Sequence, residues 1–404
     1  MRKIGNVALG VITSIGGFVE VGSLSTSAQA GAQFGLRLLW AVAVAAFILA
    51  MLAEMCGRLA AVSGRSLAAA VRERLGFHFQ LLLLGAELLL DFLLLSAELG
   101  GVAIALQLVT GVDFRWWMVP AAIVAGMILW FASFAVIEDG LGILGLITLA
   151  FVVAAWKLRP EAGPAAHAFI PSLPEHDLAR YGFFAISIVG ATVSPYLLNF
   201  YASGAIEEEW SEDDLWSNRI TAYVGMGFGA VVSMAALVAA AQVLAPQHIR
   251  VDSYEQAALM FLPVFGARAV PLFAAGLLVG CLGAAVEIAL NAGYVFSQGF
   301  GWRWGANKKR LETARFSAAM MLMLAGSLAF ALIGFDPLRV TMISVALTVI
   351  VLPVLVLPIL VLMNDRQLLK SYTSGRVGNV LLAVLCVLAA VLALIVVPFE
   401  ILGA

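Results

Sequence analysis

Long apolar runs alternate with short polar stretches along nearly the whole chain. A helix needs about 20 consecutive apolar residues to cross the hydrocarbon core of a bilayer. Windows of that length predict an all-helical protein with eleven membrane spans. The expected spans are 6–33 (interrupted), 37–61, 79–107, 116–137, 140–157, 183–204 (interrupted), 220–245, 269–297, 316–335, 338–363 and 378–402.

The composition supports a polytopic membrane protein. Of the 404 residues, 63% are hydrophobic and 12% are charged, and the mean hydropathy is +1.02. Soluble domains average about 45–50% apolar and about 25% charged residues, so an ordinary soluble domain is excluded. The expected partner is the lipid bilayer, and no nucleic acid is expected. Cys56, Cys281 and Cys386 lie singly in apolar runs and predict neither a disulfide nor a metal site.

The basic residues predict an orientation. With a cytoplasmic N-terminus, fifteen of the 23 Lys and Arg residues fall on the cytoplasmic side, in agreement with the positive-inside rule. The basic stretch 303–315 is then a cytoplasmic topology anchor, and the acidic stretch 207–214 is a cytoplasmic loop. The MRKIGN start lacks a small-residue cleavage site and is expected to lead into the first span. We therefore expect a bacterial inner (plasma) membrane protein with an extracytoplasmic C-terminus.

Two of the expected spans are interrupted at matching positions. The first contains IGGFVEVGS at 15–23, and the sixth contains VGATVSPY at 189–196. Pro195 removes a helical hydrogen bond, and irregular backbone at membrane depth is tolerated only where it is buried in protein or lines a cavity. Paired broken helices are typical of transporters built from inverted repeats, with the substrate site between the breaks.

Glu20 is the strongest candidate for function. It lies in the first break, and a charged group at membrane depth is costly and usually functional. Since unwound backbone exposes carbonyl groups that coordinate cations, we expect Glu20 to meet a cation there. Glu287 and Asn291 share one face of the eighth expected span because they are four residues apart.

The third expected span carries an acidic stripe. Glu87, Asp91 and Glu98 share one helix face. Such a stripe predicts either a proton relay or a structural pairing of Glu87 and Asp91 with an arginine of another helix. Elsewhere, Glu54 and Arg58 have the favourable i,i+4 order for a structural ion pair.

Five further stretches of the chain carry recognisable motifs. They are AGAQFGLRLLW (30–40), RLAAVSGRSLAAAVRERLG (58–76), SAELGGVAIAL (96–106), GATVSP (190–195) and LPVLVLPILVLMNDRQLL (352–369). These stretches resemble the Nramp family of divalent metal transporters, and the resemblance covers most of the chain in the expected order. It implies a leucine-transporter-like (APC) fold, with five-plus-five helices in two inverted repeats, one extra helix, and alternating access.

The resemblance also implies how the chain is divided. The first inverted repeat is expected over 1–158 and the second over 183–363. An extracellular loop at 159–182 separates them. Residues 364–404 would form a cytoplasmic loop and the eleventh helix.

The chain departs from the family at the implied metal site. The family's first-helix motif is Asp-Pro-Gly-Asn, and the aligned residues here begin with Glu20 and end with Ser23. The sixth-helix motif is Ala-x-x-Met-Pro-His, where this chain keeps Ala191 but has Ser194 and Tyr196 in place of Met and His. The implied metal ligands are therefore Glu20, Ser23, the Ala191 carbonyl and Ser194.

Two further departures concern proton coupling and the tenth helix. The family's proton-accepting Asp of the third helix aligns with Leu95, and its tenth-helix Gln aligns with Val345. We therefore expect proton coupling to be weak or absent. The residues left to move protons, or to support the metal ligands, are Glu98, Asp91, Glu287, Tyr196 and Asn291.

The implied ligand set contains only oxygen. Carboxylate, hydroxyl and carbonyl oxygens suit Mg²⁺ and Mn²⁺, whereas thioethers favour softer metals. The sequence thus predicts a monomeric secondary transporter, not an enzyme, with Mn²⁺ or Mg²⁺ as substrate and no cofactor. One alternative is a transporter of a small organic solute or anion on the same scaffold. Another is a sensor that binds its ligand without transporting it.

Overall fold

The computed structural model describes residues 20–174 and 176–402, and every regular element within these ranges is a helix. The longer helices are α2 (Val21–Phe34), α3 (Leu39–Ser63), α5 (Phe77–Thr110), α6 (Phe114–Phe131), α7 (Phe134–Gly145), α8 (Leu149–Leu158), α10 (Leu178–Thr192), α11 (Pro195–Glu207), α13 (Met226–Val243), α16 (Ala269–Phe300), α17 (Ala314–Ala331), α18 (Pro337–Leu362) and α20 (Arg376–Leu402).

Short helical elements connect the long ones. The short α-helices are α4 (Leu67–Leu75), α9 (Ala162–His167), α12 (Leu215–Ile220), α14 (Tyr254–Ala258), α15 (Leu262–Phe265) and α19 (Arg366–Leu369). The 3₁₀ elements are η1 (Gly35–Leu38), η2 (Leu146–Thr148), η3 (Glu212–Asp214), η5 (Ala245–Gln247), η6 (Leu259–Phe261) and η7 (Gly266–Arg268), and η4 (Thr221–Gly225) is a π-helical turn.

Nine stretches of the described chain are long and apolar enough to cross a bilayer. One of them, Gly22–Ser63, combines α2 with α3, which correspond to the end of the first expected span and to the second. At the position of the eleventh expected span, α20 adds a shorter apolar helix, Arg376–Val391. Residues 6–19 of the first expected span lie outside the described ranges. The expected all-helical, multi-span architecture is confirmed, and the division into two repeats stays a prediction.

The boundary between the fourth and fifth expected spans was wrong. The chain turns at 132–133, so α6 ends and α7 begins about six residues earlier than the apolar runs indicated. Ser133 caps α7 by accepting a hydrogen bond from the Val136 N–H. The side chain of Asn307 accepts another from the Phe134 N–H at 3.1 Å. Two capping groups, one of them far away in the sequence, thus start the new helix α7 within an apolar run.

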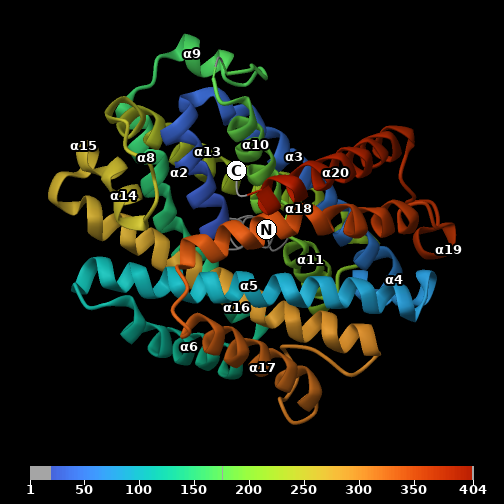
Figure 1. The fold of residues 1–404 in the computed structure, drawn as a ribbon. Coiled ribbons are helices and arrows are strands. Elements are labelled where there is room, and N and C mark those ends of the chain that lie inside the picture. The colour runs from blue at the N-terminus through green and yellow to red at the C-terminus, as the bar shows by residue number, and fades with distance from the viewer. Residues whose placement is uncertain (1–19, 175, 403–404) are drawn as a thin grey trace.

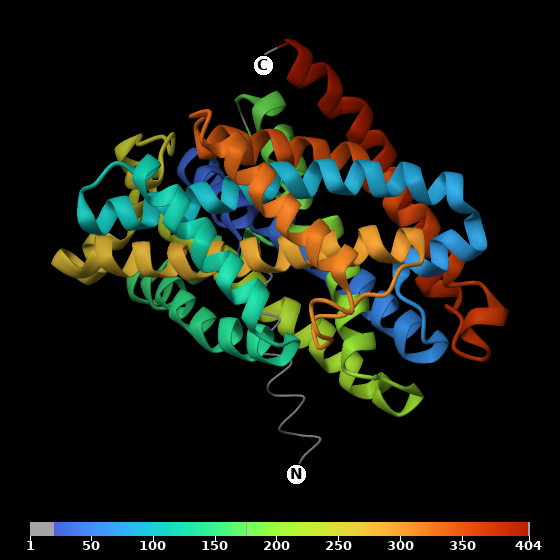
Figure 2. The ribbon, with the colours of Figure 1, turned by 90° about the horizontal axis from the view of Figure 1, so that it is seen from below.

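Figure 1 shows α5 and α16 running alongside one another, with α6 and α17 on their outer side. On the other side of this pair, α18 packs against α5, α10 and α20. The view in Figure 2 shows the same helices from below, with α20 at the edge of the molecule. The helix α2 packs against α10 and α13. The two half-helices α2 and α10 are therefore enclosed by the rest of the bundle.

Two glycines allow these half-helices to pack closely. A Cβ atom on Gly31 of α2 would overlap the backbone carbonyl of Leu237 in α13. A Cβ atom on Gly190 of α10 would lie 2.5 Å from Val349 Cγ2 and 2.7 Å from the Val345 carbonyl oxygen, both on α18. Neither distance is compatible with a side chain, so glycine sets the position of α2 and of α10 against their neighbours.

Candidate functional site between two helix ends

Glu20 lies where α2 begins and faces the second break. Its backbone is extended (φ −98°, ψ 167°), and the helix starts at the next residue. Its side chain is buried, with 1% of the residue exposed. The hydroxyl of Ser194 donates to Oε1 at 3.2 Å, and the hydroxyl of Tyr196 donates to Oε2 at 2.9 Å. The structure thus brings together three of the residues predicted from the sequence.

The second break lies between α10 and α11. The helix α10 ends at Thr192, and α11 starts with Pro195 in its first turn. In a continuous helix, the Ala191 carbonyl would accept from the residue four positions later. That residue is Pro195, which has no N–H. The interruption predicted here is confirmed, and it leaves the Ala191 carbonyl without a helical donor.

Ser23 and Val345 complete the immediate surroundings of Glu20. The Ser23 hydroxyl donates to the Glu20 backbone carbonyl at 3.1 Å. A Cβ atom on Gly22 would lie 3.5 Å from both Glu20 Oε1 and Val345 Cγ2, and 3.8 Å from Ala191 Cβ. Glu20, Ala191 and Ser194 therefore lie close together, with the aliphatic side chain of Val345 on one side, and Ser23 contacts the backbone of Glu20.

Glu287 of α16 adds a second carboxylate to this region. It is 5% exposed, and its Oε2 atom has no hydrogen-bond partner within the described part of the chain. Glu20, Glu287 and Glu98 all lie in the neighbourhood of the Tyr196 hydroxyl. Neither Glu20 nor Glu287 forms an ion pair with a described residue. A cation bound near both carboxylates would balance their negative charge.

A second acidic centre, which we call the acid–amide cluster, consists of Glu87, Asp91, Asn199 and Asn291. Asn199 Nδ2 donates to both carboxylate oxygens of Glu87 at 2.9 Å. Asn291 Nδ2 donates to Glu87 Oε1 at 2.9 Å and to Asp91 Oδ2 at 3.0 Å. All four residues are buried. The side chain of Asn291 therefore forms its hydrogen bonds within this cluster, although Asn291 shares a helix face with Glu287.

Of the two alternatives for the acidic stripe, the pairing of Glu87 and Asp91 with an arginine was wrong, and the proton relay stays a prediction. Among the described residues, neither Glu87 nor Asp91 forms an ion pair, and the amides of Asn199 and Asn291 take that role. Asn199 was not identified from the sequence. Its only signal was a polar residue inside an expected span, one helical turn after Pro195.

The ion pair expected at the second span is confirmed. Arg58 Nη2 lies 3.3 Å from Glu54 Oε2, and Arg219 Nε lies 3.7 Å from the other carboxylate oxygen. Arg58 Nη1 also donates to the Tyr372 carbonyl at 3.2 Å. Glu54 is thus structural, which separates it from Glu20 and Glu287, neither of which forms an ion pair with a described residue.

No group of three or more His, Cys, Asp or Glu side chains in the described ranges is arranged to hold a metal ion. The candidate centre at Glu20 therefore differs from a cage of charged ligands. Its donors are a carboxylate, two hydroxyl groups and a backbone carbonyl. Such a set suits a cation that keeps part of its water shell.

Several curated proteins are similar to this chain. A divalent metal cation transporter MntH of Deinococcus radiodurans is 27% identical over 308 residues, which cover 72% of this chain and 68% of the relative. A protein of the same name from Verminephrobacter eiseniae is 30% identical over 303 residues, covering 72% and 67%.

Solved structures show the same fold. The Eremococcus coleocola manganese transporter, in complex with an aromatic bis-isothiourea substituted compound, superposes with a TM-score of 0.80 at 18% identity, covering 96% of this chain and 85% of that chain. MhsT in complex with L-phenylalanine superposes with a TM-score of 0.63 at 16% identity, covering 96% and 97%. The expected leucine-transporter-like fold is therefore confirmed.

The family model for natural resistance-associated macrophage protein-like (Nramp) proteins matches residues 10–398, nearly the whole chain. This match agrees with the five stretches that resemble the family and with the expectation of a multi-pass membrane transporter that is not an enzyme. The chain belongs to the Nramp family.

Proposed function

We propose that this protein transports a divalent metal cation across the membrane, with the cation bound between α2 and the α10–α11 break. The observation that carries the proposal is the contact of Glu20 with Ser194 and Tyr196. It joins the carboxylate of one broken helix to the hydroxyls of the other. The names of the curated relatives support the same substrate class.

The ligands would be Glu20, Ser23, the Ala191 carbonyl and Ser194. The Tyr196 hydroxyl occupies Glu20 Oε2, which leaves Oε1 for the cation once the Ser194 hydroxyl turns its oxygen toward the metal. This all-oxygen set favours Mn²⁺ or Mg²⁺ over soft transition metals. A manganese transporter among the structures of the same fold is consistent with one of these two ions.

Transport would proceed by alternating access, with weak or absent proton coupling. The positions where the family has a proton-accepting Asp and a His are Leu95 and Tyr196 here. The membrane potential alone supplies about 2.3 kcal/mol per charge for each 100 mV, which suffices to drive uptake of a divalent cation. Glu98, Asp91 and Glu287 remain the acids by which protons would move if coupling is found.

The proposed setting is the bacterial plasma membrane, with a monomeric protein and a cytoplasmic N-terminus. The basic segment 303–315 supports this orientation. An epitope at either terminus, tested for accessibility in intact cells, measures it directly. An N-terminal epitope that is accessible from outside intact cells would contradict the proposed orientation. It would also mean that the transport cycle runs in the opposite direction.

The function is tested by uptake of Mn²⁺ and Mg²⁺ into proteoliposomes, with calorimetric titration of the same ions. Wild type and a Glu161→Gln control, changed at an exposed loop residue, should bind and transport equally. Glu20→Ala should lose both activities. Unchanged uptake by Glu20→Ala would contradict the site, and binding without uptake in wild type would indicate a sensor. Uptake of an organic solute, unaffected by metal ions, would favour the solute transporter.

A further inference from the structure

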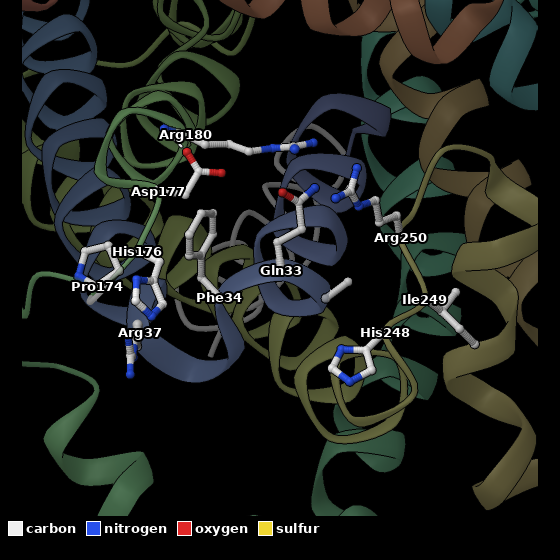
Figure 3. Close-up of a pocket in the computed structure, with 11 residues that line it drawn as sticks. Gln33, Phe34, Arg37, Pro174, His176, Asp177, Arg180, His248, Ile249 and Arg250 are labelled. Atoms are coloured by element: carbon white, nitrogen blue, oxygen red, sulfur yellow. Dashed lines mark hydrogen bonds between the residues drawn. The ribbon is translucent and has the colours of Figure 1, made fainter. Parts of the chain in front are cut away.

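A cavity of about 670 Å³ opens where α2 ends and α10 begins. Figure 3 shows the side chains that line it. They come from three separate parts of the chain: the end of α2 with η1, the residues leading into α10, and the segment after η5. The polar side chains among them are those of Gln33, Arg37, His176, Asp177, Arg180, His248 and Arg250.

The lining is strongly basic. Among the described residues that line it are three arginines and a single acid, Asp177, which accepts a hydrogen bond from the Arg180 N–H at the start of α10. None of the three guanidinium groups forms an ion pair with another described residue. In Figure 3 the side chains of Arg180 and Arg250 extend toward one another, with Gln33 between them. Like charges gathered in one cavity repel one another, and an anion bound between them would relieve that repulsion.

The cavity lies at one end of the proposed transport route. Gln33 is near the end of α2, whose other end is Glu20, and Arg180 is near the start of α10, which ends beside Ala191. At 1.5 Å per residue, these helices lead from the cavity to the candidate metal site over roughly 15–20 Å. The helices α2 and α10 also pack against one another.

The positive charge of the lining disfavours the entry of free divalent cations through this cavity. A cavity lined by one sign of charge concentrates ligands of the opposite sign, and this lining is positive. The planar guanidinium fork matches carboxylate and phosphate oxygens with two parallel hydrogen bonds. The volume falls in the range of about 300–1,000 Å³ that is typical of small-molecule sites.

We propose that this cavity binds a small polyvalent oxyanion of the di- or tricarboxylate class. Arg180 and Arg250 would hold carboxylate groups from two sides, and the Gln33 amide would supply a hydrogen bond between them. Carboxylates of this class also chelate divalent cations. The cavity would then receive the metal together with its chelator, a step that rests on the proposed function, whereas binding of the anion does not.

Calorimetric titration of the full-length protein with citrate, in detergent and without any metal, tests the proposal. Arg180→Gln and Arg250→Gln should each weaken citrate binding by about tenfold, as expected for loss of a charged hydrogen bond. The matched control is Arg268→Gln, an exposed arginine outside the cavity, which should bind like wild type. Glu20→Ala should also bind citrate normally, which separates this test from that of the metal site.

Three results would overturn the proposal. The first is no citrate binding by wild type. The second is citrate binding by the double variant Arg180→Gln/Arg250→Gln that equals that of wild type. A loss of citrate binding in Arg268→Gln as large as that in the cavity variants would likewise indicate general charge attraction. The third comes from nanodiscs: citrate binding that is present in phosphatidylcholine but displaced by phosphatidylglycerol would assign the arginines to lipid headgroup phosphates. Retained binding in both lipids supports the organic acid.

Discussion

Two buried acidic centres lie within this bundle, and they are built differently. At Glu20 the carboxylate meets hydroxyl groups and unwound backbone. In the acid–amide cluster, both carboxylates lie on one continuous helix, α5, and accept from asparagine amides. The hydroxyl groups of the first centre are able to turn their oxygens to a cation, whereas the amide nitrogens of the second centre already donate to its carboxylates. The comparison supports the proposal that the first centre binds the cation and that the second fixes helix positions.

The largest expected effect is that of Glu20→Gln. It keeps the shape of the side chain but removes the charge that attracts the cation. We expect Mn²⁺ uptake to fall by at least about 100-fold, the upper end of what even a group supporting a metal ligand costs. Asp91→Asn in the acid–amide cluster is the matched comparison and should keep Mn²⁺ binding. Equal loss in both variants would show that the two centres form one site.

Gly190→Ala should damage the first centre through its backbone. The new Cβ atom would meet Val349 and the Val345 carbonyl of α18, and overpacking of this kind costs about 1–3 kcal/mol. We expect a lower unfolding temperature and reduced Mn²⁺ affinity. Gly182→Ala lies on the same helix with nothing within 4 Å of its Cβ position and should leave both unchanged. A harmless Gly190→Ala would mean that α10 shifts freely against α18.

Ser194→Met should change selectivity more than it changes stability. It places a thioether where the hydroxyl now faces Glu20, and soft ligands favour soft metals. We expect Cd²⁺ binding relative to Mg²⁺ to rise by about tenfold, or about 1.4 kcal/mol. Competition titrations measure this ratio, with Ser187→Met, a buried serine of α10 away from the break, as the control. An unchanged ratio would exclude Ser194 as a ligand.

The smallest effect on transport is expected from Asn291→Ala. It removes the donor that bridges Glu87 and Asp91, and loss of a buried hydrogen-bond partner costs about 1–3 kcal/mol of folding free energy. Chemical unfolding should show this loss while Mn²⁺ affinity stays within about twofold of wild type. A large drop in metal affinity would instead place the acid–amide cluster in the transport pathway.

Local signals predicted part of this structure correctly. Pro195 marked the second break, and the spacing of Glu54 and Arg58 marked an ion pair, because both depend on residues within one helical turn. The partners of Glu87 could not be predicted, since Asn199 and Asn291 are 112 and 204 residues away. The start of α7 was misplaced for the same reason, because Asn307 caps it from 173 residues away.

The basic cavity was not predicted from the sequence either. Its arginines lie in three separate parts of the chain, and the sequence offered no reason to bring them together. The apolar pattern locates helices but carries no information on which of their ends meet. The sequence was therefore sufficient to identify Glu20 as a candidate. The arrangement of the polar side chains around it could be seen only in the folded structure.

The proline after the second break has a consequence for divergence within the family. Because Pro195 withholds an N–H from Ala191, the ligand that we propose at Ala191 is set by the main chain and does not depend on any side chain. Substitutions at 194 and 196 would then change which ion is preferred and leave this ligand in place. A transporter built in this way would be able to acquire a new substrate through single substitutions, each of which keeps part of the site.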